Sequence, residues 1–508
     1  MNLKFNRPAP LAPLAALAAL ALLAGCKPDL ESSPKASAGD ADFARYIAVG
    51  NSLTAGFADN GLYREGQLSS YPSILAQQFR AVGGGEFRQP LFTEAQANGS
   101  GYLVLTGFTA PTPTAPSAPI TGGVAPQAVR GFFTPALVQI PVAPGVTVPY
   151  QGPPRPLLTK YLDPIENLGV PGIRLSDILT PGYGSQAGNP YFERITPDGT
   201  PFQTYLQRIG AEAQSATFFS CWLGNNDILG FATAGAAANP PTPADTFRLK
   251  YNRALNVLTA RGAKGVVATI PDVTGIPFFT TVGPGFRARL ATPQPGLPNG
   301  VPGIVILTGA NPGGPTSANR RQIATADIRL TPGNGRQLFT LTSSAFLGLI
   351  GRPTSAPWRY IFSQANQPQV LFGPFLNAFG IDTTAAFGVS AGNPIPSAFV
   401  LDDVEQTTVI NVTNQYNADI TAAGNARGLA VFDANGYFRN IAANGAVANG
   451  VANGAGFISG NLFGLDGVHP TPRGYALIAN EMIRAINVRY NASVSGVDAT
   501  TYRGVKFP

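Results

Sequence analysis

The chain has 508 residues, of which 44% are hydrophobic and only 12% are charged, and it contains 59 glycines and 47 prolines. This composition predicts a folded, loop-rich protein with a sizeable core and excludes a chain that is disordered throughout. The formal net charge of +7 is thinly spread along the sequence. Because Lys and Arg form no cluster interleaved with aromatic residues, we expect no nucleic-acid partner.

The first 25 residues have the pattern of an export signal. Lys4 and Arg7 precede the apolar run Leu11–Leu23, and Leu23-Ala24-Gly25 leads directly to Cys26. A basic flank, a short apolar core and small residues before a cleavage point are typical of secretory signals, and the run is short for a membrane span. The Leu-Ala-Gly-Cys sequence resembles the lipobox of bacterial lipoproteins. The resemblance implies that the signal is removed and that Cys26 is acylated.

An acylated Cys26 would hold the protein on a membrane outside the cytoplasm. The next residue is Lys27, and in bacterial lipoproteins an Asp there can cause retention at the inner membrane, so Lys27 favours the outer membrane of the cell envelope. We expect residues 26–42 to be a flexible tether. The alternative is a plain signal peptide with an incidental cysteine. Cys221 then remains alone, which excludes an intramolecular disulfide, and we expect it to pack as a small buried hydrophobe.

From Phe43 onward, alternating strand and helix patterns predict a single α/β domain over residues 43–490. The predicted strands are the short apolar runs Tyr46–Val49, Ala216–Leu223, Gly265–Ile270 and Leu429–Phe432. The predicted helices begin at Tyr71-Pro72, at Thr242-Pro243, at Asp402 with Glu405 completing a capping box, and at Thr471-Pro472. Strands that alternate with helices indicate a parallel central sheet.

Two long segments interrupt this pattern. Residues from about 98 to 160 and from about 276 to 398 are rich in Gly and Pro, so we interpret them as insertions. The first is expected to be a loop or a small β-rich excursion. Residues 444–456 are rich in Gly and Asn and are expected to form a loop, and the C-terminal tail, 491–508, has no clear period.

Four short motifs follow one another along the chain, and each one follows an apolar strand candidate or begins a helix. They are Gly50-Asn51-Ser52-Leu53, Asn167-Leu168-Gly169-Val170-Pro171-Gly172, Gly224-Asn225-Asn226-Asp227 and Asp466-Gly467-Val468-His469. Because parallel sheets collect their sites at the carboxyl ends of the strands, all four motifs can reach one edge of the sheet.

Three of these residues have the chemistry of a nucleophilic triad. Ser52 follows a strand and Gly50, where the backbone can turn sharply and expose a hydroxyl. His469 is the only histidine of the chain, and an unperturbed imidazole pKa of about 6.5 suits it to accept the serine proton. Asp466 precedes it by three residues, a spacing that lets a carboxylate orient the ring and stabilise the imidazolium.

Acyl transfer also needs hydrogen-bond donors that face the developing oxyanion. The candidates are the backbone N–H groups of Ser52 and Gly172 and the side-chain amide of Asn226. The loss of one such donor typically costs about 2.7–4 kcal/mol of transition-state stabilisation. We expect Asp227 to brace the loop of Asn226 rather than to take part in the chemistry.

The ordered set Ser52, Gly172, Asn226 and His469 resembles blocks I, II, III and V of the SGNH/GDSL ester hydrolases. The resemblance includes IAVGNSLTAGF, LGNNDIL and DGVHPTPRGYALIANE and leaves both insertions outside it. It implies a three-layer α/β/α flavodoxin-like fold, a catalytic triad of Ser52, Asp466 and His469, and no metal or organic cofactor. One residue departs from the pattern, because Asn51 stands where block I usually has Asp. That Asp is not the triad acid, so the mechanism survives its loss.

The resemblance leaves the substrate open among acylglycerols, aryl esters and acetylated glycans. The apolar patches Ile276–Phe279 and Ala345–Ile350 of the second insertion are candidates for acyl-chain contact, or they form the insertion's own core. A second hypothesis is a catalytically weak or inactive surface lipoprotein that uses the hydrolase scaffold for binding, since fold does not dictate function. Asn51 and the long insertions motivate that hypothesis, whereas the intact Ser, Gly, Asn, Asp and His favour hydrolysis.

Overall fold

The computed structural model describes residues 36–110, 119–143, 146–293, 300–309 and 319–507. The predicted signal peptide, Cys26 and most of the tether therefore lie outside the described residues. Among the helices that are described, none is long and apolar enough to cross a membrane.

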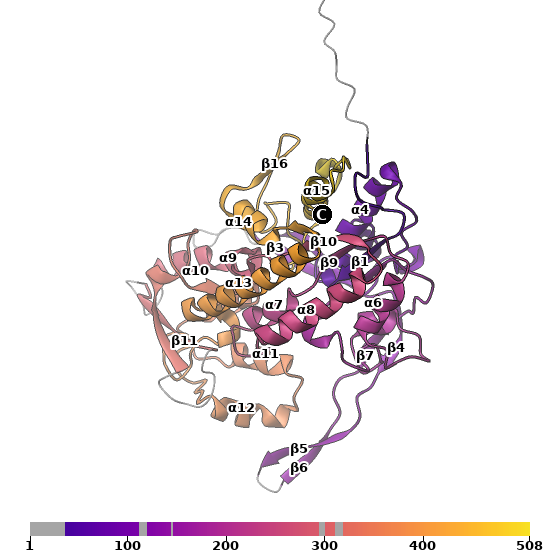
Figure 1. Cartoon of the computed structure of the whole chain (residues 1–508). Helices are drawn as coiled ribbons and strands as arrows, with labels where there is room; N and C mark the ends of the chain where they lie inside the picture. The colour runs from indigo at the N-terminus through magenta and orange to yellow at the C-terminus, as the bar shows by residue number, and fades with distance from the viewer. Residues whose placement is uncertain (1–35, 111–118, 144–145, 294–299, 310–318, 508) are drawn as a thin grey trace, which may run out of the picture.

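A five-stranded, all-parallel sheet forms the centre of the fold (Figure 1). Its strands lie in the order β8 (Asn167–Gly169), β1 (Tyr46–Gly50), β9 (Phe218–Trp222), β10 (Lys264–Ala268) and β15 (Ala430–Phe432). Counted along the chain this order is 2-1-3-4-5, so the winding direction reverses between β1 and β9. The four strands predicted from apolar runs are all confirmed, and so is their parallel arrangement.

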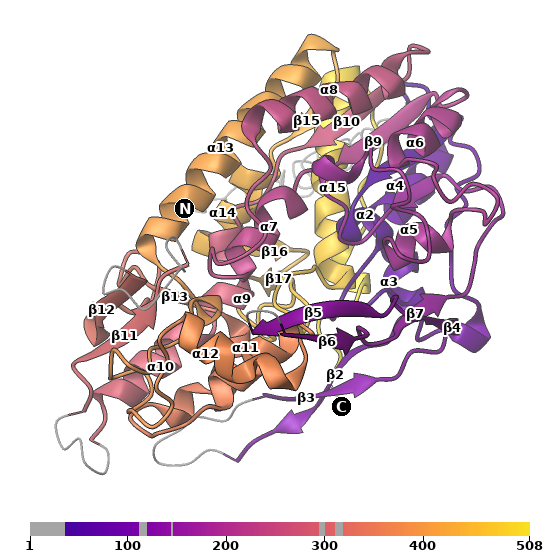
Figure 2. The same ribbon diagram turned by 90° about the horizontal axis from the view of Figure 1, so that it is seen from below.

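Helices cover both faces of the sheet because its inner strands are buried on both sides. Ile47, Val49 and Val267 pack in one hydrophobic cluster with α6 (Tyr205–Ala213), α8 (Ala244–Thr259) and α13 (Asp403–Ala426). The alternate residues Tyr46, Ala48 and Val266 pack in a second cluster with α4 (Tyr71–Phe79) and α15 (Pro472–Tyr490). Helices α8 and α13 run side by side in both views (Figures 1 and 2).

Cys221 belongs to the buried face of β9. Its side chain is enclosed by the first of these clusters, and burial raises the pKa of the thiol to about 12. The prediction that Cys221 packs as a small hydrophobe is confirmed.

The predicted helix starts are confirmed with one difference. Asp402 and Glu405 form the reciprocal capping box of α13, and Thr471 caps α15 by accepting the N–H of Gly474. At α8, however, Pro243 is the residue that precedes the helix and no side chain caps it. The hydroxyl of Thr242 instead donates to Asp227, so this residue fastens two helices rather than beginning one.

The first insertion is β-rich, which was one of its two expected forms. β2 (Tyr102–Phe108) pairs with β3 (Pro119–Val124), β4 (Val129–Phe133) with β7 (Arg155–Leu158), and β5 (Val138–Ala143) with β6 (Val146–Tyr150). None of these six strands joins the central sheet. The β5–β6 hairpin projects from the body in Figure 1, and in Figure 2 it reaches toward α11 (Ala356–Gln364). There the hydroxyl of Tyr150 donates to the carbonyl of Asn366.

The second insertion has helices, strands and a core of its own. It contains α10 (Val282–Ala291), α11, α12 (Phe372–Ala378) and the antiparallel pair β11 (Gly303–Leu307) and β12 (Arg320–Ala324). Leu347 and Ile350 belong to this separate core, whereas Ile276 and Phe279 belong to the main core. The Ala345–Ile350 patch is therefore internal packing.

The expectation of a loop over residues 444–456 is wrong. After α14 (Ala434–Asn444), the strands β16 (Ala446–Ala448) and β17 (Val451–Asn453) form a hairpin. Its two turn residues, Asn449 and Gly450, have φ values of +45° and +78°, which tight two-residue hairpin turns require. The Asn-Gly pair was the signal that could have identified this hairpin.

Candidate active site at the carboxyl edge of the sheet

Ser52, His469 and Asp466 meet at the carboxyl end of β1. The Oγ atom of Ser52 lies 2.9 Å from Nε2 of His469, and Nδ1 of His469 lies 2.8 Å from Oδ2 of Asp466. Ser52 is the first residue of α2 (Ser52–Ala55), whereas the other two residues lie on the loop that precedes α15. The structure thus brings all three predicted side chains into one hydrogen-bonded chain.

The carboxylate of Asp466 is surrounded by N–H donors. Oδ1 accepts the backbone N–H groups of Val468 at 2.8 Å and His469 at 2.9 Å, and Oδ2 accepts the N–H of Asn60 at 2.8 Å. Burial by itself raises the pKa of Asp466, but the adjacent His469 and these hydrogen bonds outweigh burial and hold the pKa below its usual value. An ionised Asp466 favours the tautomer with the proton on Nδ1, which leaves Nε2 free to accept a proton from Ser52.

The imidazole is held in place from other directions as well. The ring of Phe57 packs on it with 4.7 Å between ring centroids, and the carbonyl of His469 accepts the N–H of Gly464 at 2.8 Å. The hydroxyl of Tyr475, from α15, donates to the carbonyl of Phe57 at 2.6 Å. The base therefore has little freedom to turn away from Ser52.

Close packing at the end of β1 explains why Gly50 precedes Asn51 and Ser52. A Cβ atom on Gly50 would lie 2.0 Å from Oγ1 of Thr54 and 2.7 Å from the carbonyl oxygen of Trp222. The glycine is thus needed for the close approach of α2 rather than for an unusual backbone angle. Beside it, the buried hydroxyl of Tyr205 accepts the N–H of Gly50 at 3.2 Å and donates to the carbonyl of Leu168 at 2.6 Å, which ties the ends of β1 and β8 together.

Asn51, the residue that departs from the SGNH pattern, is buried and caps α2. Its Oδ1 atom accepts the N–H of Leu53 at 3.0 Å. Its Nδ2 atom has no hydrogen-bond partner among the described residues. The amide thus keeps the capping acceptor that a carboxylate would also supply.

The two remaining oxyanion candidates follow β8 and β9, the two strands that flank β1 in the sheet. Gly172 follows β8 in a turn with φ of +83°, a conformation that favours glycine, and within the described part of the chain its N–H has no hydrogen-bond acceptor. Asn226 is the first residue of α7 (Asn226–Thr233), after β9, and its amide donates to the carbonyl of Ile173 at 2.9 Å. Asn226 lines the same pocket as Ser52 and His469, whereas Gly172 does not line it.

Asp227 braces this arrangement, as predicted. Its buried carboxylate accepts the N–H of Leu175 at 2.7 Å and the hydroxyl of Thr242 at 2.5 Å. Burial, only partly opposed by these hydrogen bonds, raises the pKa of Asp227 to about 6. The carboxylate joins α7 to the turn that follows Gly172 and so fixes the loops of both donor candidates.

Several supporting residues could not be predicted from the sequence. Asn60 and Tyr205 contact triad or strand-end atoms, and the buried Asp59 accepts the N–H of Leu465 at 2.9 Å and the hydroxyl of Tyr63 at 2.8 Å. The bond from Leu465 anchors the loop that carries Asp466, and the bond from Tyr63 holds the carboxylate of Asp59 in place. No local pattern links these positions, because residues 59 and 60 lie 406 residues from their partners 465 and 466.

An apolar pocket opens directly beside Ser52 and His469. Its volume, open mouth included, is about 520 Å³. Besides the residues named above, the apolar part of its lining comprises Leu53, Leu229, Pro271, Val273, Ile276, Phe438, Phe463, Val468 and Pro470. The pocket can therefore shelter an apolar group whose end lies against Ser52.

Comparison of the sequence with models of known protein families gives no match, and comparison with curated proteins gives none either. The function of this chain is therefore inferred from the geometry of the site.

Proposed function

We propose that this protein is a carboxylic ester hydrolase of the SGNH/GDSL type that works through an acyl-Ser52 intermediate. The observation that carries the proposal is the continuous chain from Ser52 through His469 to Asp466, with contacts of 2.9 and 2.8 Å. The strand order 2-1-3-4-5, with helices on both faces, supports a three-layer α/β/α flavodoxin-like fold. The apolar pocket beside Ser52 suits the acyl group of an ester.

In the acylation step, Nε2 of His469 accepts the proton of Ser52 while Oγ attacks the carbonyl carbon of the ester. The carbonyl oxygen becomes an oxyanion, for which the N–H groups of Ser52 and Gly172 and the amide of Asn226 are the proposed donors. The imidazolium then gives its proton to the departing alkoxide as the bond between the carbonyl carbon and the alcohol oxygen breaks. The alcohol leaves, and the acyl group stays on Oγ.

Deacylation repeats these roles with water as the nucleophile. His469 accepts a proton from water as the water oxygen attacks the acyl carbon. His469 then gives a proton to Oγ of Ser52 as the bond between Oγ and the acyl carbon breaks. Asp466 remains ionised and stabilises the imidazolium in both steps. The products are a carboxylic acid and the free enzyme, and the cycle needs no other reactant.

On the lipobox sequence we also propose that Cys26 carries lipid and anchors the enzyme to the cell envelope. Mass spectrometry of the membrane-extracted protein tests this proposal. We expect an N-terminal peptide that begins at Cys26 and carries acyl chains, and a Cys26→Ser variant that is released from the membrane. An unmodified Cys26 inside a longer peptide would contradict it.

The catalytic proposal is tested with Ser52→Ala and His469→Ala. Ser215→Ala is the matched control, because Ser215 is exposed and precedes the amino end of β9, whereas Ser52 and Asn226 follow the carboxyl ends of β1 and β9. With p-nitrophenyl butyrate, kcat/KM should fall at least about 10³-fold in both site variants and stay unchanged in the control. A fluorophosphonate probe should label the wild type and the control but not Ser52→Ala. Unchanged turnover in both site variants would refute the assignment, and a folded wild type that neither turns over nor labels would favour the binding lipoprotein.

A further inference from the structure

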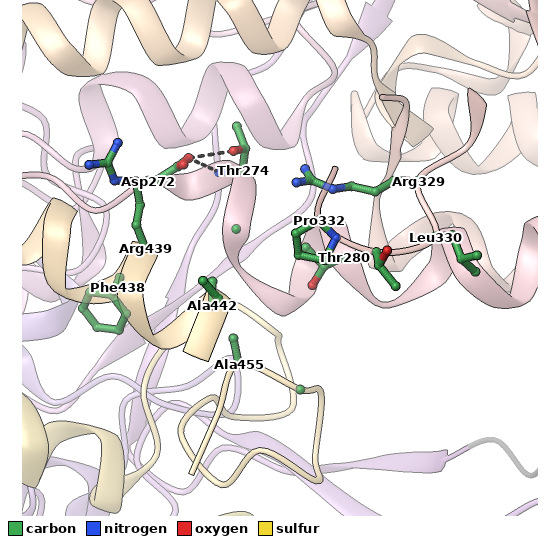
Figure 3. Close-up of a pocket in the computed structure, with 14 residues that line it drawn as sticks. Asp272, Thr274, Thr280, Arg329, Leu330, Pro332, Phe438, Arg439, Ala442 and Ala455 are labelled. Atoms are coloured by element: carbon green, nitrogen blue, oxygen red, sulfur yellow. Dashed lines mark hydrogen bonds between the residues drawn. The ribbon is translucent and has the colours of Figure 1, made fainter. Parts of the chain in front are cut away.

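A second and larger cavity, whose lining is drawn in Figure 3, adjoins the apolar pocket of the candidate active site. Measured with its open mouth included, its volume is about 1010 Å³, compared with about 520 Å³ for the apolar pocket, so it is large enough for a small-molecule ligand. The two cavities share Phe438 of α14, and the short 3₁₀ turn η4 (Val273–Gly275) separates them. Val273 lines the apolar pocket, whereas Thr274 and Gly275 line the larger cavity. A ligand in the larger cavity is thus one side-chain layer from the pocket that holds Ser52.

Two arginines give this cavity its chemical character, and we call it the arginine pocket. Arg439 follows Phe438 on α14, and Arg329 comes from the segment after β12 in the second insertion. In Figure 3 their guanidinium groups lie on opposite sides of Thr274. Across the described ranges of the chain, neither side chain has a hydrogen bond or an ion pair.

The lining of the arginine pocket contains one further charged residue, Asp272, and one of its two carboxylate oxygens is hydrogen-bonded. Oδ1 of Asp272 accepts the N–H of Thr274 at 2.9 Å and its hydroxyl at 2.7 Å, as Figure 3 shows. Two arginines and one aspartate leave a formal charge of +1 on the lining. Most of the other wall is apolar and includes Leu330, Pro332, Phe438, Ala442, Ala443 and Ala455. Such a cavity suits a small organic group that carries a negative charge.

Building on the proposed function, we propose that the arginine pocket binds a phosphate or carboxylate on the alcohol side of the ester. The substrate class is then an acyl ester of an anionic alcohol. The apolar pocket, which contacts Ser52 and has no Arg, Lys, Asp or Glu in its lining, takes the acyl group. An alkyl chain placed in the arginine pocket would instead strip water from two guanidinium groups without replacing their hydrogen bonds.

The second insertion supplies Arg329, one of the two arginines of the arginine pocket. The backbone N–H of Arg329 donates to the carbonyl of Gln337 at 3.0 Å, and Arg287 donates to the carbonyl of Ile328 at 3.2 Å. These bonds hold the segment of Arg329 beside α10, so one arginine is supplied by the insertion and the other by the core domain. The hydrolase core would carry the chemistry, and the insertion would select the alcohol.

The test compares two esters that share an acyl group, 1-butyrylglycerol 3-phosphate and 1-butyrylglycerol. We expect the wild type to prefer the phosphate ester by about tenfold or more in kcat/KM, and the preference should weaken as salt is raised. Arg329→Gln and Arg439→Gln should each lower the ratio of the two kcat/KM values about five- to tenfold, since each removes a charge-assisted contact. Arg253→Gln on the exposed side of α8 is the matched control and should keep the wild-type ratio.

The remaining outcomes separate this inference from the proposed function. Hydrolysis of both esters at equal efficiency, or a ratio that the two arginine variants do not change, would overturn the inference while the esterase assignment stands. The wild type could instead prefer an ester with an anionic acyl group, such as methyl hydrogen glutarate, and lose this preference in both arginine variants. That result would place the charge on the acyl side of the ester and would also overturn the inference. Absence of hydrolysis together with absence of fluorophosphonate labelling would refute the proposed function itself. Circular dichroism of each variant verifies that the fold is retained.

Discussion

At the scale of single residues, the carboxylate of Asp466 is the most constrained group of the site. Each of its oxygens faces two N–H donors, from Val468 and His469 on one side and from Asn60 and the His469 ring on the other. A carboxylate accepts at all these positions, whereas an amide must turn its own N–H₂ toward one pair of donors. The site therefore depends on the charge of this residue and also on its purely accepting character.

Asp466→Asn should be severely defective for this reason. Either orientation of the amide opposes N–H to N–H, and the imidazolium that forms during acylation loses its counter-charge. We expect kcat for p-nitrophenyl butyrate to fall about 10³-fold or more, with lower thermal stability. Asp163→Asn, at an exposed loop position, is the control and should behave like the wild type. A kcat for Asp466→Asn within tenfold of the wild type would show that Asp466 does not serve the base.

At the scale of elements, the sequence was most informative where local chemistry decides the structure. The capping box of Asp402 and Glu405 and the short apolar strands form as predicted because each depends on neighbours a few residues away. Thr242 failed as a predicted cap because Pro243 is the residue that precedes α8, and the Thr242 hydroxyl accepts from Arg174 and donates to Asp227 instead. The insertions resisted prediction for the same reason, since their cores join residues far apart in sequence.

The site shows the same division. Ser52, Asp466 and His469 could be singled out because the chain has only one histidine and the motif order is distinctive. Their supports could not, because the contact between Asn60 and Asp466 and that between Tyr205 and Gly50 exist only after folding. The lining of the apolar pocket could be predicted only in part. Ile276 belongs to an apolar patch that stands out in the sequence, whereas no sequence pattern indicated Phe438.

The buried carboxyl of Asp227 on α7 leads to a prediction about how the stability of the protein changes with pH. The pKa of Asp227 is about 6 in the folded protein and about 3.9 in an unfolded chain. Between about pH 4 and pH 6 the folded protein keeps a proton that the unfolded chain has lost. The contribution of Asp227 to the free energy of unfolding is therefore full below about pH 4 and falls by the order of 1–3 kcal/mol as the pH rises to 6.

Urea denaturation of the wild type and Asp227→Asn from pH 4 to pH 8 measures this contribution. We expect the variant to lose the part of the pH dependence that lies between pH 4 and pH 6. Glu405→Gln is an informative comparison, because burial and the nearby Asp402 raise the pKa of Glu405 to about 7, so its loss should flatten the profile up to a higher pH. A wild-type slope in Asp227→Asn would mean that this carboxyl titrates normally.

At the scale of the whole molecule, the second insertion and the α/β core line the two pockets together. The insertion begins at Ile276, which lines the apolar pocket and packs in the main core, whereas Ile350 is enclosed in the insertion's own core. Both side chains are 6% exposed. The two apolar patches thus have different roles although they belong to one insertion and have similar composition.

These two isoleucines provide a matched test of acyl-chain selection. Ile276→Ala removes carbon atoms from the pocket wall, so the ratio of kcat/KM for p-nitrophenyl octanoate to that for the butyrate should rise about fourfold for each additional methylene that becomes buried. Both variants should lose a similar amount of stability, about 2–5 kcal/mol. Ile350→Ala should leave the ratio unchanged, because its cavity opens in a core that does not contact the pocket. Ratios that rise equally in both variants would indicate general loosening rather than a pocket wall at Ile276. A rise confined to Ile276→Ala would show that chain-length preference is set where the insertion joins the core.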